Sequence, residues 1–261
     1  MFRLFVMAAC LMSAPAFAQD EGGAPNFVAV GIAALPESPG ADSYRFIPFA
    51  AGRVRTGDVV LQVEGPGLSA SFLNQGPVEA GAYVRYYGGR DDDTGDVIVD
   101  LLPEADSGIV AGGFVRYQVA DGLLTPFDRL YVSGRLGMDV TGEYSGVFWS
   151  GSAAYATPLS RTTLLIANLS ISGTPDDYAD ALFSVSNVGA LASGLPVFTA
   201  QSGLQDIGLT FLLDQQVTDN WSVTGIFSAS RLQGDYADSP IVTIRGDEMQ
   251  YFAGLGIGRR F

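Results

Sequence analysis

Apolar and polar residues alternate one by one over many segments of this chain, and the last segment shows the pattern best. Its two faces are Tyr251, Ala253, Leu255 and Ile257 on one side and Gly254, Gly256, Gly258 and Arg260 on the other. A period of two is that of a β-strand, and a strand in lipid is apolar outward and small or polar inward. Because the segment ends on the aromatic Phe261, we expect it to close an outer-membrane β-barrel; a strand of a soluble sandwich is the alternative.

The same alternation predicts twelve strands along the chain. They cover residues 26–34, 44–54, 59–64, 68–73, 78–87, 109–119, 129–140, 144–156, 163–171, 204–216, 221–232 and 251–261. Short connections alternate with long ones, as short periplasmic turns alternate with long external loops in such barrels. The long connections are residues 35–43, 88–107, 173–202 and 233–248. An even count places both termini of the chain on the periplasmic side. Ten strands remain possible if residues 59–73 form a small hairpin outside the wall.

Composition separates membrane strands from membrane helices. Hydrophobic residues make up 48% and charged residues 16% of the chain, which contains 33 glycines. Beyond the N-terminal segment, no uninterrupted apolar run approaches the roughly 20 residues that a spanning helix needs. A closed barrel instead pairs its backbone polar groups between strands. We therefore predict an all-β fold, a transmembrane antiparallel up-and-down β-barrel.

The first residues have the order of an export signal. Arg3 is followed by a short apolar stretch and by Ala16-Phe17-Ala18, a small-x-small cleavage pattern. This order is typical of a secretory signal peptide. We expect residues 1–18 to be removed, residues 19–261 to form the barrel, and the protein to lie in the cell outer membrane. Lipidation at Cys10 is the alternative; if Cys10 leaves with the signal, the mature chain has no cysteine.

The charge of the chain excludes one class of partner. There are 14 Lys+Arg against 28 Asp+Glu, a net charge of −14. Nucleic acid is therefore not expected to bind, because phosphate neutralisation needs basic patches. The acidic residues cluster between strands, at 91–93, 104–106, 176–177 and 247–248. We interpret these clusters as solvated loops; a divalent-cation site that bridges to anionic lipid head groups is the alternative.

The residue inventory also bears on catalysis. The chain has no histidine, which excludes hydrolases that use a histidine base and zinc sites built on imidazole. We expect neither an enzyme nor a cofactor. Ten charged residues fall on inward faces: Arg45, Arg53, Glu64, Glu79, Arg85, Arg116, Arg135, Asp139, Asp206 and Asp214. A structural charge network in the lumen explains them more simply than two-carboxylate catalysis does.

Three aromatic residues are expected to mark the periplasmic edge of the membrane. Tyr155 ends one strand, Trp221 begins another, and Phe261 follows the last one. Such side chains favour positions with one side apolar and the other wet. Arg259 is expected at the same interface, with its guanidinium directed to lipid head groups; in the alternative, a bulge turns it into the lumen.

Several motifs occur in the order and spacing of a known family. They are Ser193-Gly194-Leu195-Pro196, residues 203–209, Trp221-Ser222, Ser230-Arg231-Leu232, residues 237–242 and Phe252-Ala253-Gly254-Leu255-Gly256. With them the chain resembles the MipA/OmpV family of MltA-interacting outer-membrane proteins, although Arg259 stands where an aromatic is more usual. The resemblance implies a scaffold in murein turnover, between a lytic transglycosylase and a synthase. It supplies no catalytic residues.

Two functions follow as hypotheses. The first is a non-enzymatic structural or scaffolding barrel in contact with outer-membrane lipid and with periplasmic murein hydrolases or synthases. The alternative is a narrow diffusion channel for small solutes, since twelve strands lie between side-chain-filled and open barrels. Segment 173–202 contains Phe183, Val185, Val188 and Leu191, an apolar content that is unusual for a solvated loop and compatible with a plug.

Overall fold

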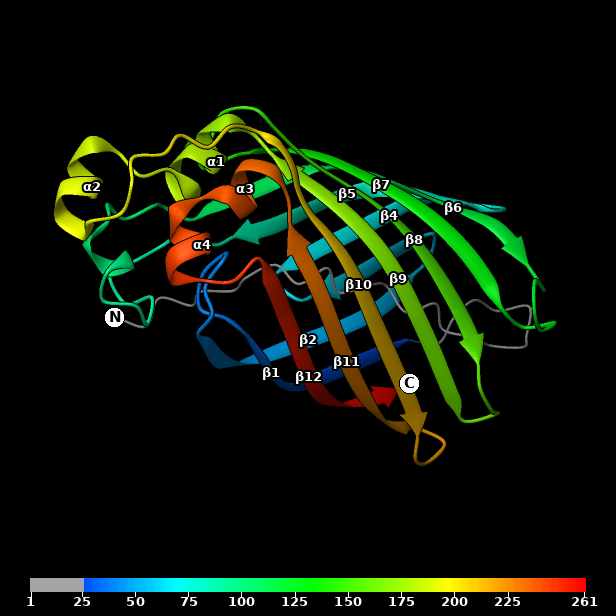
Figure 1. The fold of residues 1–261 in the computed structure, drawn as a ribbon. Coiled ribbons are helices and arrows are strands. Elements are labelled where there is room, and N and C mark those ends of the chain that lie inside the picture. Colours follow the sequence, from blue (N-terminus) through cyan, green and yellow to red (C-terminus); the bar gives the residue numbers. More distant parts are fainter. Residues whose placement is uncertain (1–25) are drawn as a thin grey trace.

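Twelve antiparallel strands close into one barrel in the computed structural model, which describes residues 26–261 (Figure 1). Each strand pairs with its neighbours in sequence, and β1 pairs with β12, so the topology is up-and-down as predicted. The alternative of ten strands is wrong, because β3 and β4 pair with β2 and β5 within the wall. The expected signal peptide, residues 1–18, lies outside the described residues.

The strand bounds follow the alternation closely. They are β1 Phe27–Pro36, β2 Tyr44–Thr56, β3 Val59–Glu64, β4 Gly67–Gln75, β5 Val78–Tyr87, β6 Gly108–Asp121, β7 Arg129–Asp139, β8 Val147–Pro158, β9 Thr163–Thr174, β10 Gly203–Gln216, β11 Trp221–Leu232 and β12 Met249–Arg260. The largest difference at a strand start is β8, which was expected to begin at Tyr144. Gly146 has a φ of +106°, a left-handed conformation that favours glycine, and Tyr144 is buried before it.

The seam between β1 and β12 shows how the two faces are built. Val30 lies opposite Ile257 in register, and both side chains are exposed outward, as is Leu255. On the inner face, a Cβ on Gly31 would lie 2.3 Å from the carbonyl oxygen of Leu255 and 2.5 Å from the ring of Phe49. Only glycine fits there. The outward placement of Leu255 and Ile257 agrees with the expected register of the closing strand.

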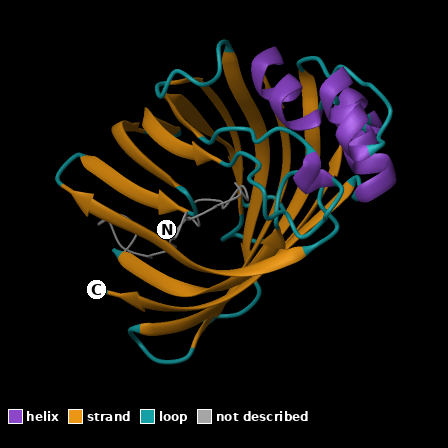
Figure 2. Ribbon diagram, turned by 90° about the vertical axis from the view of Figure 1, so that its left-hand side faces the viewer, coloured by secondary structure: helices purple, strands orange, loops and turns teal. Residues whose placement is uncertain are grey.

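Three of the four long connections at one end of the barrel, those after β5, β9 and β11, contain helices where the sequence predicted loops. The helices are η1 Val99–Leu101, α1 Asp176–Phe183, α2 Asn187–Ser193, α3 Gly234–Asp238 and α4 Pro240–Arg245. Figure 2 shows them gathered on one side of this end, which we call the outer end. We call residues 88–107, 175–202 and 233–248 the cap. No helix among the described residues is long and apolar enough to cross a membrane.

The apolar residues of segment 173–202 divide between the cap's interior and its surface. Phe183 and Val185 are fully buried, whereas Val188 and Leu191 are exposed. Helix α1 also reaches the inner faces of the strands, because the ring of Tyr178 lies 5.5 Å from that of Phe148 on β8. The segment therefore covers part of the barrel mouth by packing on the outer ends of the strands.

Candidate functional site

We call the end of the barrel away from the cap the inner end. The half of the lumen near this end holds a cluster of charges around Glu79 on β5. Arg116 donates from Nη1 to Glu79 Oε2 at 2.9 Å, and Arg53 Nη2 lies 3.9 Å from the same oxygen. Ser71 donates to Glu79 Oε1 at 2.9 Å, and Arg53 also donates to Gln62 at 3.1 Å. Two guanidinium groups thus share one carboxylate across strands β2, β5 and β6.

A second ion pair crosses the lumen. Arg135 on β7 donates to Glu64 on β3 at 2.6 Å, although three strands separate β3 from β7 in the wall. The Arg135 guanidinium carbon also lies 5.6 Å from the ring centre of Tyr83 and 6.0 Å from that of Phe114. A cation over aromatic faces gains further electrostatic attraction. This pair therefore ties together two parts of the wall that are not neighbours in the sheet.

A third pair joins β10 to β12. Arg260 donates to Asp214 Oδ2 at 2.6 Å, and Thr224 on the intervening β11 donates to Asp214 Oδ1 at 2.6 Å. Arg260 faces inward, as the register of the closing strand predicts, although it was not among the ten charged residues selected from the sequence. The pair lies near the end of the barrel where the chain finishes.

The remaining selected residues lie toward the outer end of the lumen. Asp206 on β10 accepts a hydrogen bond from Ser172, and Arg85 on β5 lies against the ring of Tyr87. Arg45 lies on the inward face at the outer end of β2. The ten residues are therefore distributed over separate groups along the lumen.

Asp139 differs from the expectation. Its carboxylate makes no ion pair among the described residues and instead accepts backbone N–H groups of Glu143 at 2.7 Å and of Thr141, Tyr144 and Ile109 at 3.1 Å. The reason is its position as the last residue of β7, where the following turn leaves N–H groups without strand partners. Asp139 thus organises the β7–β8 connection.

The three expected girdle residues lie at the inner end of the barrel. Trp221 is 46% exposed, and the guanidinium carbon of Arg259 lies 5.6 Å from its ring centre. Arg259 is opposite Trp221 in the β11–β12 register and faces outward. Phe261 is exposed, and the Tyr155 hydroxyl donates to Asp128 at 2.6 Å. This end of the wall carries aromatic rings and an outward arginine.

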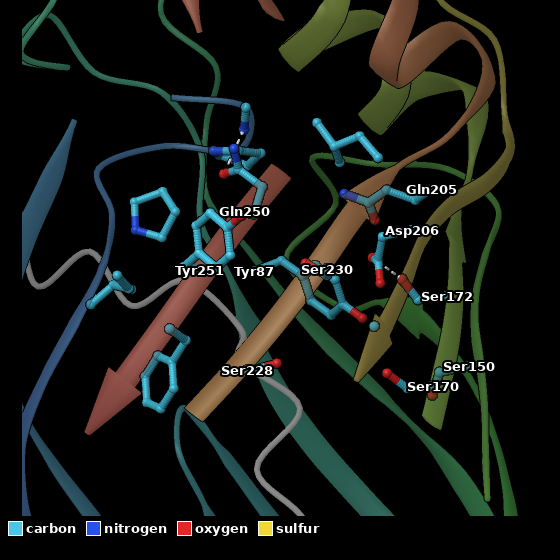
Figure 3. A pocket seen from close by; sticks show the side chains of 18 of the residues that line it. Tyr87, Ser150, Ser170, Ser172, Gln205, Asp206, Ser228, Ser230, Gln250 and Tyr251 are labelled. Carbon is cyan, nitrogen blue, oxygen red and sulfur yellow. Dashed lines mark hydrogen bonds between the residues drawn. The ribbon is translucent and has the colours of Figure 1, made fainter. Parts of the chain in front are cut away.

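Among the cavities that residues 26–261 line, two of the larger ones lie along the lumen. The outer cavity, of about 120 Å³, is lined by serines of β8, β9 and β11, by Asp206 and by Tyr87 (Figure 3). The inner cavity, of about 80 Å³, is lined by Phe49, Leu212, Asp214 and Arg260 among others. A buried apolar group borders both cavities and comprises Ala33, Leu35, Ala156, Ile166, Leu212, Ile226 and Phe252.

Arg90, in the cap, was not selected from the sequence. Its side chain is buried and donates to the carbonyl oxygens of Leu182 at 2.8 Å, Pro103 at 2.9 Å and Ala181 at 3.3 Å. Burial lowers the pKa of Arg90 to about 10, so the guanidinium stays charged at neutral pH. A lone arginine next to the acidic residues 91–93 is the only sequence signal that could have indicated this role.

A bidentate ion pair also holds the cap. Arg245 at the end of α4 donates to Asp96 Oδ2 from Nη2 at 2.6 Å and from Nε at 3.0 Å. Burial opposes the charged form of Asp96, but hydrogen bonds from Arg245 and from the N–H groups of Ile98 and Val99 outweigh it and lower its pKa. Within residues 26–261, no group of three or more potential ligand residues is placed to hold a metal ion.

Comparison with known proteins places this barrel in a family. The family described as MltA-interacting protein MipA matches residues 28–261, whereas no curated protein matches the chain. Among solved structures, the NanC porin is 7% identical, covers 90% of this chain and 100% of its own, and has a TM-score of 0.47. OprB of Pseudomonas putida is 12% identical, and the match covers 83% of this chain and 56% of OprB with a TM-score of 0.41. The monoaromatic hydrocarbon channel CymD is 12% identical, and the match covers 91% of this chain and 88% of CymD with a TM-score of 0.39. Because the family match spans all twelve strands, this chain is an outer-membrane β-barrel of the MipA family.

Proposed function

We propose that the protein is a non-enzymatic scaffold that holds a murein lytic transglycosylase of the MltA type at the inner face of the outer membrane. The family description supplies the class of partner. A scaffold of this kind needs an ordered surface at the periplasmic end of the barrel, which we assign to the end with the short turns. The β6–β7 connection offers that surface.

The β6–β7 connection lies at the inner end of the barrel, opposite the helices (Figure 1), and its apolar side chains are exposed. Leu124 is 82% exposed, and Leu123 and Phe127 are about half exposed. These residues lie beyond Asp121 and Arg129, the last paired positions of β6 and β7. Charged positions thus separate these apolar side chains from the apolar outward face of the wall. This separation favours contact of the side chains with a protein partner over contact with lipid.

Asp128 holds this connection in one conformation. Its carboxylate accepts the N–H groups of Leu123 at 2.6 Å, Leu124 at 2.7 Å and Thr125 at 2.8 Å. Burial opposes the charge, but the Tyr155 hydroxyl and these N–H groups lower the pKa of Asp128 to about 2. The carboxylate therefore stays ionised at neutral pH, and a preformed surface loses less conformational entropy when a partner binds. This ordered apolar connection is the observation that carries the proposal.

The test is binding of purified lytic transglycosylase to the detergent-solubilised full chain by biolayer interferometry. The wild-type barrel is expected to bind, and L124S is expected to bind about tenfold more weakly, because an exposed apolar anchor is lost. Leu159→Ser is the matched control, since Leu159 is also exposed, in the neighbouring β8–β9 turn. Absence of wild-type binding would overturn the scaffold; equal binding by L124S would overturn this surface.

A narrow diffusion channel for small solutes is the second candidate. The two cavities along the lumen favour it, because they leave space on both sides of the apolar group. Planar-bilayer recording of the refolded protein would then show discrete conductance steps, and deletion of residues 176–198 would enlarge them by removing part of the cap. If neither the wild-type protein nor the deletion variant gave conductance steps, conduction through the barrel would be excluded.

A further inference from the structure

We propose that the outer cavity is a binding site for a small, uncharged, polyhydroxylated molecule, such as a polyol or a single sugar ring. The proposal does not rest on the scaffold function. Its first support is the lining, which combines serines from three strands: Ser150, Ser170, Ser172, Ser228 and Ser230. Figure 3 shows the hydroxyl end of Tyr87 directed toward the part of this wall that contains Asp206 and Ser172.

Several of these side chains have unused hydrogen-bonding capacity. The Ser172 hydroxyl donates a hydrogen bond to Asp206, and the Ser228 hydroxyl is hydrogen-bonded to that of Thr210. The hydroxyls of Ser150, Ser170 and Ser230, in contrast, make no hydrogen bond to any residue within 26–261, although all three line the cavity. A serine hydroxyl both donates and accepts. A ligand that carries several hydroxyl groups matches such a wall, because each of its groups can take either role.

The charges at the cavity favour a ligand with no net charge. Asp206 and Arg85 both line it, so the site already contains one group of each sign. A ligand with a net charge would add an uncompensated charge to a partly buried site, which is unfavourable. Asp206 offers a strong acceptor to a ligand hydroxyl while Ser172 holds its other side.

Apolar side chains form another part of the lining, and the cavity's volume limits the ligand's size. Leu35, Leu232 and Phe252 are buried side chains that border the cavity, and the C–H face of a sugar can lie against such a wall. At 10–15 Å³ for each water-sized group, the 120 Å³ cavity holds about eight to twelve non-hydrogen atoms. That range corresponds to a four-carbon polyol up to one hexose.

The test is saturation-transfer NMR titration on the full chain, refolded in a detergent without a sugar head group. The probes are D-xylose, D-glucose and erythritol, with L-alanine as a zwitterion of similar size. At least one polyhydroxylated probe is expected to bind with saturation, and L-alanine is not. No saturable binding of any of the three hydroxylated probes would overturn the proposal, and preferential binding of L-alanine would overturn the assigned ligand class.

Variants locate the binding. Ser230→Val removes a hydroxyl and narrows the outer cavity, so binding is expected to fall at least tenfold. Ser230→Ala removes the hydroxyl without added bulk and is expected to weaken binding about fivefold, a typical value for one hydrogen bond. Thr224→Val is the control, because Thr224 lines the inner cavity only. Unchanged affinity in both Ser230 variants, with folding verified by heat-modified gel mobility, would overturn the site.

Discussion

The barrel wall and the cap are built by different rules. In the wall, each strand bonds to its sequence neighbours, and only the β1–β12 seam joins the two ends of the chain. In the cap, single side chains connect distant segments: Arg90 reaches Leu182, Arg245 reaches Asp96, and Ser239 donates to the Phe183 carbonyl at 2.6 Å. The wall therefore depends on a repeated pattern, whereas the cap depends on a few individual groups.

The lumen charges are where the wall itself depends on individual groups, so removal of Glu79 should have the largest effect. Glu79→Ala removes the carboxylate that Arg53 and Arg116 share. Breaking a buried ion pair in this way costs about 3 to 5 kcal/mol, and we expect about 3 kcal/mol because these side chains keep some contact with water. The measurement is urea unfolding of the barrel in phospholipid vesicles.

The control for this change is Glu104→Ala in the cap. Glu104 is exposed and forms no ion pair among the described residues, so its loss should change the free energy of unfolding by less than about 0.5 kcal/mol. The double variant E79A/R116M should recover part of the stability lost in E79A, since one of the two neighbouring positive charges is also removed. Equal stability of E79A and wild type would show that the cluster does not stabilise the wall.

Substitution of an exposed leucine by arginine should destabilise the protein strongly in the wall and hardly at all in the cap. Leu255 in the middle of β12 is 64% exposed, and Leu191 on α2 is 90% exposed. Arginine at a lipid-facing position near the midplane costs about 2–4 kcal/mol, so L255R should be strongly destabilised in vesicles. L191R should stay within about 0.5 kcal/mol of wild type. Similar losses in both variants would contradict the assignment of one leucine to lipid and the other to water.

The success of the strand predictions has a local cause. A period of two is visible within ten residues, and the lipid-facing side of each strand must be apolar throughout its length. The sequence therefore predicted twelve strands and the outward faces of Leu255 and Ile257 without knowledge of any distant contact. The cap helices were missed because the longest has only eight residues, and their burial depends on other segments of the chain.

The arrangement of the lumen charges could be predicted only in part. Strand parity placed Glu64 and Arg135 on inward faces, but their pairing across three intervening strands depends on the stagger of the wall and on side-chain length. Parity could not show that Asp139 bonds to backbone groups, because strand ends obey turn chemistry. Arg90 was missed for the same reason as the helices, since two of its three partners, Leu182 and Ala181, lie about ninety residues away.

Acid should loosen the cap before it affects the wall. Because the folded-state pKa of Asp96 is lowered, the stability it provides is complete above the ordinary carboxyl pKa of about 4 and is lost as pH falls through the lower folded value. Exposed ion pairs contribute little, so the protection factors of the amides in residues 240–245, which correct for the intrinsic pH dependence of exchange, should fall only about two- to fivefold on acidification. Asp96→Asn should show these lower protection factors already at pH 7, and Asp92→Asn, in the exposed acidic run, should not. An identical pH profile in D96N would rule out Asp96 as the group that titrates.

The smallest effect is expected where the wall meets the inner interface. The guanidinium of Arg259 lies over the ring of Trp221, and an exposed cation–π contact contributes about 0.5–1 kcal/mol. Arg259→Ala should therefore lower the free energy of unfolding in vesicles by about 0.5 kcal/mol. Arg161→Ala is the control, because Arg161 is exposed in the β8–β9 turn at the same end and has no aromatic partner within the described chain. If the loss comes from the ring contact, R259A should cost nothing further in a Trp221→Leu background. If R259A costs the same in both backgrounds, Arg259 acts through lipid head groups, and the wall's edge is stabilised by charge at the interface and not by this specific pair.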